Sequence, residues 1–250
     1  MDLSPVLRFG LLLLRPGIVV MLAPGLGGRQ IPTMVKIGLT VMIAIALVPS
    51  VTLPAIGNAS LTLIILRELA VGLSLVFATQ ALVAGVEFAG HLASYQIGFS
   101  YGATIDPISG VRSTMLVSLY GMLATLVFLG VNGHHALLRA LVMSYDGVPI
   151  GAVRVNESLV TSVRELLAMV FVVGLRLAAP VLIVLLIVEL TIGLISRTSP
   201  SLTYQVIGYP LRIVVGLFLI GTLIYTVPAV TRSMLETALM IGGRTATAFR

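Results

Sequence analysis

One short polar break, Gly98-Phe-Ser-Tyr-Gly-Ala-Thr-Ile-Asp-Pro-Ile-Ser-Gly-Val-Arg112, separates two long apolar runs. The Asp106-Pro107 step disfavours continued helix before the proline, and Gly110 tolerates backbone angles that other residues resist. The pattern predicts a re-entrant or hairpin loop that is held by apolar helices on either side. It fits a functional loop, and it also fits a plain helix–helix turn.

The composition places the chain among membrane proteins or proteins buried by apolar partners. Its 250 residues are 58% hydrophobic and 10% charged, and the mean hydropathy is +1.13. A soluble domain has about 25% charged residues, so this chain cannot cover a water-facing surface. Lipid tails and neighbouring leucines are similar solvents, so hydropathy does not separate the two cases. Cysteine is absent, which removes disulfides and thiolate chemistry. The basic residues are scattered, which argues against a nucleic-acid surface.

The apolar runs predict an all-α fold: a polytopic helical membrane protein of about six long helices, some bent or broken, in a single domain, 1–250. The segments after the fourth and sixth runs are expected to form an amphipathic stretch with a turn, and a short tail. The third and fifth runs exceed a hydrocarbon core of ~30 Å. The runs cover residues 9–23, 37–48, 61–95, 114–131, 166–195 and 213–227.

The first run is interrupted by Arg15-Pro16-Gly17, which predicts a bent or broken helix. A lone charge at mid-bilayer costs at least ~2.5–3.5 kcal/mol. Arg15 therefore needs a carbonyl, a carboxylate or an interfacial position.

Buried polar side chains are expected on two of the long runs. Glu87 and His91 are spaced i,i+4 and share a face with Gln80. They form a proton relay, or they satisfy each other or a neighbouring subunit. Arg176 and Glu189 are too far apart on one helix to pair, so each needs another partner, in a subunit contact or in the bundle interior.

Small residues recur every fourth position near the end of the third run. Such a ridge allows neighbouring helices to approach closely. It leads directly into the polar break and consists of Gly90, Ser94, Gly98 and Gly102.

No sequence motif supports catalysis. The chain lacks G-x-x-x-x-G-K-[ST], H-E-x-x-H and G-x-S-x-G motifs. Few histidines and no cysteine make a metal site unfavourable, so we expect no metal, no cofactor and no enzyme activity. A membrane enzyme would depend on His134 and His135, and a small-molecule permease would need two repeated halves, which we do not find.

Several motifs resemble a known family in both order and spacing. They are Arg15-Pro16-Gly17, Val86-Glu-Phe-Ala-Gly-His-Leu-Ala-Ser-Tyr-Gln-Ile-Gly-Phe-Ser100, Asp106-Pro107, Phe128-Leu-Gly-Val-Asn-Gly-His134 and Gly208-Tyr-Pro-Leu-Arg212. Together they resemble the FliR family of flagellar export-gate proteins, whose virulence counterparts are the SctT proteins of type III secretion.

The resemblance implies a subunit of a protein-conducting gate in the bacterial inner membrane, at the flagellar basal body. It implies a helical subunit like a fusion of FliP-like and FliQ-like chains. The implied partners are FliP-like, FliQ-like and FlhB-like subunits, unfolded exported chains and membrane lipid, without nucleic acid. A virulence export subunit is the alternative, and a small-molecule permease is a more distant one.

The resemblance also implies that the polar break plugs the pore. A plug must move without unfolding the helices that hold it, and a short loop with proline and glycine meets this need. The implied plug residues are Asp106, Pro107, Ile108, Ser109, Gly110, Val111, Arg112, Ser113 and Thr114.

Overall fold

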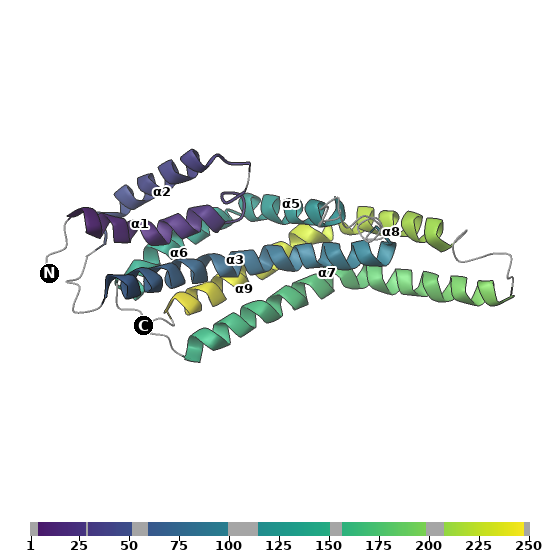
Figure 1. Ribbon diagram of the computed structural model, residues 1–250. Helices are drawn as coiled ribbons and strands as arrows, with labels where there is room; N and C mark the ends of the chain where they lie inside the picture. The colour runs from purple at the N-terminus through teal and green to yellow at the C-terminus, as the bar shows by residue number, and fades with distance from the viewer. Residues whose placement is uncertain are drawn as a thin grey trace. The chain divides into compact units, whose positions relative to one another are not determined.

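The computed structural model describes residues 5–28, 30–51, 60–99, 115–150, 157–198 and 208–247, and these residues form eight helices and no strand (Figure 1). The predicted all-α fold is confirmed, and every predicted apolar run falls on a helix. The helices are α1 (Pro5–Leu22), α2 (Thr33–Leu47), α3 (Leu61–Ile97), α5 (Met115–Gly130), α6 (Gly133–Gly147), α7 (Glu157–Thr198), α8 (Tyr209–Leu223) and α9 (Thr226–Thr247).

Two segments contain more helix than the sequence predicted. The segment expected to form an amphipathic stretch with a turn after the fourth run forms α6, and the expected short tail is the 22-residue α9. Both helices bury a stripe with helical spacing, which includes Leu137 and Leu141 in α6, and Thr231 and Leu235 in α9. Charged residues on the exposed sides of α6 and α9 lower the mean hydropathy of both segments. For this reason the sequence did not predict either segment as an apolar run.

Among the described residues, two helices are long and apolar enough to cross a membrane. Together with two bent helix pairs, they make the protein a polytopic membrane protein. The two long helices are α3, with 37 residues, and α7, with 42 residues. At ~1.5 Å per residue both exceed the ~30 Å hydrocarbon core, as expected from the sequence. Among the described helices, α5 with α6 and α8 with α9 pass the same test only as pairs joined across a short break.

The chain forms two compact units. Unit 1 comprises Met1–Leu82, Phe128–Ala168 and Met234–Arg250, and unit 2 comprises Val83–Val127 and Met169–Ser233. Helices α3, α5, α7 and α9 each contribute residues to both units.

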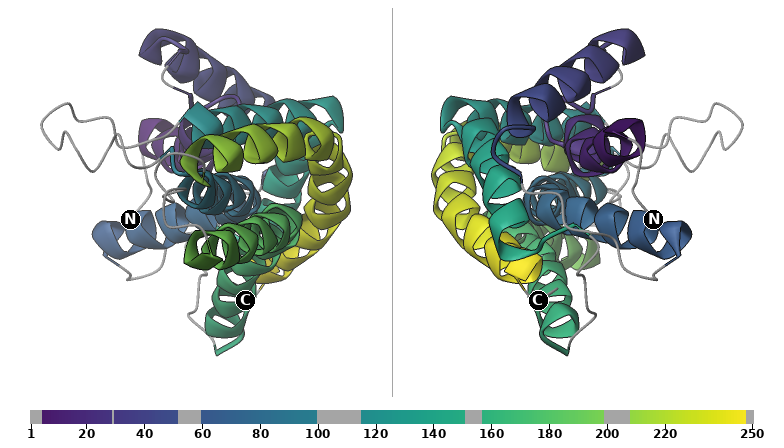
Figure 2. Two further views of the ribbon diagram at one scale, coloured as in Figure 1. Left: turned by 90° about the vertical axis from the view of Figure 1, so that its right-hand side faces the viewer. Right: turned by 90° about the vertical axis from the view of Figure 1, so that its left-hand side faces the viewer.

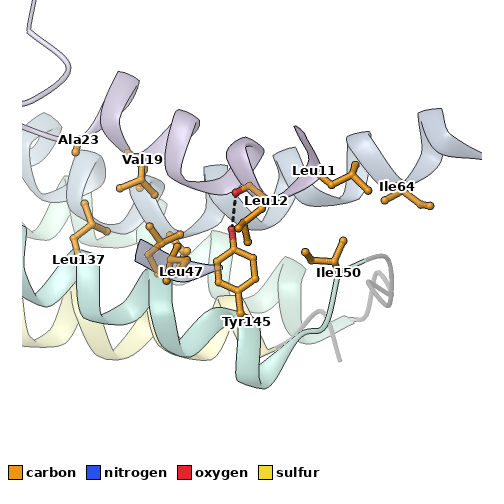
Figure 3. Packing of buried hydrophobic residues seen from close by; sticks show 12 residues of the cluster. Leu11, Leu12, Val19, Ala23, Leu47, Ile64, Leu137, Tyr145 and Ile150 are labelled. Atoms are coloured by element: carbon orange, nitrogen blue, oxygen red, sulfur yellow. Dashed lines mark hydrogen bonds between the residues drawn. The ribbon is translucent and has the colours of Figure 1, made fainter. Parts of the chain in front are cut away.

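Unit 1 is built around α1, which packs against α2 and α6. Its apolar core takes residues from α1, α2, α3 and α6 (Figure 3). At Gly72 the first part of α3 approaches α1 closely, because an added Cβ would lie 3.3 Å from the Cα of Arg15. Helix α2 lies at the edge of the unit (Figure 2), and it buries Thr40, Ala44 and Leu47.

The sequence predicted a bent or broken first helix, and α1 is not broken, because it runs as one helix through Arg15-Pro16-Gly17. Pro16 has no N–H, which leaves the carbonyl of Leu12 without its usual helical donor. The hydroxyl of Tyr145, on α6, donates a hydrogen bond to that carbonyl at 3.1 Å (Figure 3). Tyr145 therefore supplies the hydrogen bond that the proline removes, and the helix continues.

We expect Tyr145→Phe to lower the free energy of unfolding by about 1–3 kcal/mol, because a buried carbonyl loses its donor. In a Pro16→Ala background the backbone N–H returns to the Leu12 carbonyl, so Tyr145→Phe should cost much less. The measurement is a double-mutant cycle on the purified chain in detergent. Equal costs of Tyr145→Phe in both backgrounds would contradict this assignment.

The break between α5 and α6 depends on two adjacent residues. Asn132 has φ +59°, a left-handed conformation that asparagine tolerates better than most residues. The ring of Phe128 occupies the space that a side chain on Gly133 would need. The motif Phe128–His134 is thus a helix break enforced by backbone angle and by packing.

Unit 2 has the second part of α3 at its centre. A Cβ on Gly90 would lie 3.1 Å from the Cα of Val117, on α5, and a Cβ on Gly85 would lie 2.9 Å from the Cβ of Val173, on α7. The ring of Phe88 stacks edge-on against Phe171 with centroids 5.5 Å apart. Small residues on α3 therefore let α5 and α7 approach it closely.

Candidate functional site

The end of α3 is fixed by Gly98, the first residue of the polar break. Gly98 has φ +101°, which disfavours any residue with a side chain. An added Cβ would also lie 2.8 Å from the ring of Tyr209, and the hydroxyl of Tyr209 donates to the Gly98 carbonyl at 3.1 Å. The first residue of α8 thus holds the last turn of α3 in place.

A second contact holds the same end of α3. The Glu189 carboxylate, on α7, accepts a hydrogen bond from Gln96 Nε2 at 3.1 Å and forms an ion pair with Arg212 of α8. We call Gln96, Gly98, Glu189, Tyr209 and Arg212 the α3 clamp. The α3 clamp lies entirely in unit 2. Along the chain, Gln96 and Gly98 precede residues 100–114, and residues 199–207 lie between Glu189 and Tyr209.

The small-residue ridge meets two elements. Gly90 faces α5 and Gly98 faces Tyr209. Ser94 is fully buried, and its hydroxyl has no hydrogen-bond partner among the residues that the structure describes. Gly102 lies outside the described residues.

The polar residues predicted on α3 lie in different surroundings. Gln80 donates a hydrogen bond to the carbonyl of Leu22, at the end of α1. Glu87 is half-buried, with its carboxylate against Gly121 of α5, where an added Cβ would lie 2.5 Å from Oε1. His91 is exposed. The described geometry includes no hydrogen bond between Glu87 and His91.

Arg176 and Glu189 lie in contrasting positions on α7. Glu189 belongs to the α3 clamp, and its side chain is 35% exposed. Arg176 is exposed and has no ion-pair partner in the part of the chain that the structure describes. The two residues are not brought together.

The largest buried polar cluster surrounds Arg15, which lies in unit 1 with a fully buried side chain. Its Nε donates to Glu68 Oε2 at 2.6 Å, and its Nη2 donates to Glu68 Oε1 at 3.3 Å. Its Nη1 donates to the Ser144 carbonyl at 2.9 Å, and Nη2 donates to the Val148 carbonyl at 2.8 Å. The Tyr145 ring centroid lies 4.4 Å from the guanidinium carbon.

The Arg15 cluster therefore joins α1 and α3 to the C-terminal end of α6. Carbonyls at a helix C-terminus carry partial negative charge, which a cation stabilises. Sequence reasoning expected a carbonyl or a carboxylate for Arg15, and the structure supplies both. It did not identify Glu68, Ser144 or Val148.

Residues Asp106–Thr114, predicted to form the plug, lie outside the described residues, so their placement stays a prediction. Among the residues that the structure describes, no group of three or more histidine, aspartate or glutamate side chains is arranged to hold a metal ion.

The fold and the buried Arg15–Glu68 ion pair define the class of protein. Apolar helices longer than a bilayer is thick, with the buried charge of Arg15 neutralised by Glu68, are the features of a polytopic helical membrane protein.

Comparison with known proteins gives the family. Residues 6–238 match the family of bacterial export proteins, family 1, and the chain belongs to it. It is 35% identical to the flagellar biosynthetic protein FliR of Escherichia coli (strain K12) over 214 residues, covering 84% of this chain and 82% of that protein. It is 27% identical to FliR of Bacillus subtilis (strain 168) over 238 residues, covering 93% and 91%.

A relative with a different name is also similar. The surface presentation of antigens protein SpaR of Shigella sonnei is 26% identical over 154 residues, covering 62% of this chain and 59% of that protein. The resemblance to the FliR family is confirmed.

Proposed function

We propose that this chain is a subunit of the flagellar type III protein export gate, and that it helps to form and plug the protein-conducting pore in the inner membrane. The observation that carries the proposal is the match of residues 6–238 to the bacterial export family, together with the similarity to FliR over most of both chains. The protein would be required for flagellum assembly and would lie in the basal body.

The proposed partners are FliP-like, FliQ-like and FlhB-like subunits, with unfolded exported proteins as the substrate. Helices longer than a bilayer and exposed apolar side chains along α2 and α7 support assembly with other membrane subunits. We propose that residues 1–250 work as one export-gate domain. The protein would supply a path and a seal, without a cofactor or chemistry of its own.

We further propose that Asp106–Thr114 is the plug. The α3 clamp supports this role, because it holds the last turn of α3, which precedes the segment in the chain. A seal against ions must open when an unfolded chain fills the passage, which suits a small loop on a rigid base.

A virulence export gate is the second candidate, supported by the similarity to SpaR. The cargo separates the two candidates. Deleting the gene should abolish filament assembly and export of hook and filament proteins if the gate is flagellar, and export of virulence effectors if it is not.

The experiment that tests the proposal combines this deletion with affinity purification. The tagged chain should restore export, and FliP-like and FliQ-like subunits should copurify with it in stoichiometric amounts. A chain that purifies alone and transports a small molecule in liposomes would overturn the proposal in favour of a permease.

We propose that the Glu87 carboxylate accepts a hydrogen bond from the FliP-like subunit. Because hydrogen bonds to a charged group contribute about 1.5–3 kcal/mol, we expect Glu87→Gln to weaken copurification of that subunit by about tenfold. The measurement is quantitative mass spectrometry of the affinity-purified assembly. Glu236→Gln, at an exposed position of α9, is the matched control. A Glu87→Gln variant that assembles fully but loses export would favour a proton relay instead.

A further inference from the structure

Between Val172 and Leu194, one exposed face of α7 is apolar apart from a single arginine. Six large apolar side chains at helical spacing share this face with Arg176, and all lie in unit 2. We define the α7 stripe as Val172, Leu175, Ile183, Leu186, Leu190 and Leu194, which are between 42% and 69% exposed.

We propose that the α7 stripe around Arg176 is covered by an apolar helix of a partner protein, and that this helix presents a carboxylate to Arg176. The inference rests on the proposed function, since it names the chemistry of a partner in the export gate. It adds the residue that recognises this partner and the part of the surface that the partner covers.

A bilayer alone does not account for this surface. If lipid covers α7 from Leu166 onward, Arg176 lies about 15 Å deep, where a lone charge is costly. If lipid instead begins at Arg176 and ends at Arg197, it spans about 31 Å and fits the hydrocarbon core. The exposed Phe171 and Leu175 then lie outside the lipid and need another cover.

Both placements call for protein over the same turn of α7. Val172 lies one turn before Arg176 on the same face, so a helix that covers Val172 and Leu175 also passes over Arg176. The covering helix would remove water and lipid headgroups from the Arg176 guanidinium. A carboxylate on that helix best compensates for the lost solvation.

The charge of the chain points the same way. The net charge is +6, and Arg176 has no ion-pair partner in the described ranges. A second copy in parallel would place Arg176 against Arg176, which is repulsive. An acidic apolar helix of another subunit is therefore the complementary occupant.

The test compares two leucine variants of the tagged, full-length chain in its own cells. Arg176→Leu should reduce the copurified export-gate subunits by at least about tenfold, the loss expected from stripping one charge from a buried pair. Arg197→Leu, an exposed arginine at the end of the same helix, should stay within about twofold of wild type. Arg176→Lys keeps the charge, so it should retain most of the recovery and control for folding.

A photo-crosslinking residue at Val172 identifies the occupant. The adduct should map to a partner helix within one turn of an aspartate or glutamate, and exchanging that carboxylate for lysine should restore recovery of Arg176→Glu. Adducts only to lipid, adducts to a second copy of this chain, or full recovery with Arg176→Leu would overturn the inference. If the wild-type chain recovers no export subunits, the proposed function itself fails, and the two failures are thereby distinguished.

Discussion

Replacing Arg15 with methionine is expected to lower the free energy of unfolding by about 3–5 kcal/mol, the range for breaking a buried ion pair on one side. Both side chains of the Arg15–Glu68 pair are 0% exposed. Arg15→Met removes the cation beside the buried Glu68 carboxylate and two donors from the end of α6. The measurement is unfolding of the purified chain in detergent, followed by circular dichroism.

The double variant Arg15→Met/Glu68→Met is the matched control. It removes both charges and fills the space with apolar atoms, so it should recover more than half of the lost stability. Arg15→Lys should fall between wild type and Arg15→Met, because an ammonium group cannot reproduce the forked geometry. If Arg15→Met lowers the free energy of unfolding by less than about 1 kcal/mol, the buried Glu68 carboxylate does not depend on Arg15.

Arg212→Leu is expected to lower the free energy of unfolding by about 1.5–3 kcal/mol, the range for hydrogen bonds to a charged group. The substitution removes the cation from Glu189, whose carboxylate then keeps the Gln96 contact of the α3 clamp. The last turn of α3 should become less protected, and hydrogen exchange at residues 96–99 measures this locally.

Gln96→Leu is the comparison for the clamp, because it removes a neutral donor from the same carboxylate. Its cost should be smaller, about 0.5–1.5 kcal/mol. If both variants leave exchange at residues 96–99 unchanged, the clamp does not hold the end of α3.

The sequence predicted the helices well because apolar runs carry a strong signal. It also marked Arg15 as a charge that needs partners. It could not supply Glu68 or Ser144, because these positions lie on other helices and no local pattern links them. One sequence signal does indicate this pair. Arg15 and Glu68 carry opposite charges, and each falls in the buried stripe of its own helix.

The predicted break in α1 shows why local rules fail. Pro16 alone favours interruption, and only the fold places Tyr145 where its hydroxyl replaces the missing donor. The α3 clamp was missed for a similar reason. Glu189 was expected to need a partner, but Arg212 lies 23 residues further along the chain, and the sequence does not determine the path between them.

Ion conductance of the assembled gate tests the central claim most directly. Deleting Ile108–Val111 shortens the proposed plug and leaves the α3 clamp intact. The account predicts that gates with this deletion, reconstituted in planar bilayers, conduct small ions at least about tenfold better than wild type while recovering the same partner subunits. Fully assembled gates with unchanged conductance would contradict it.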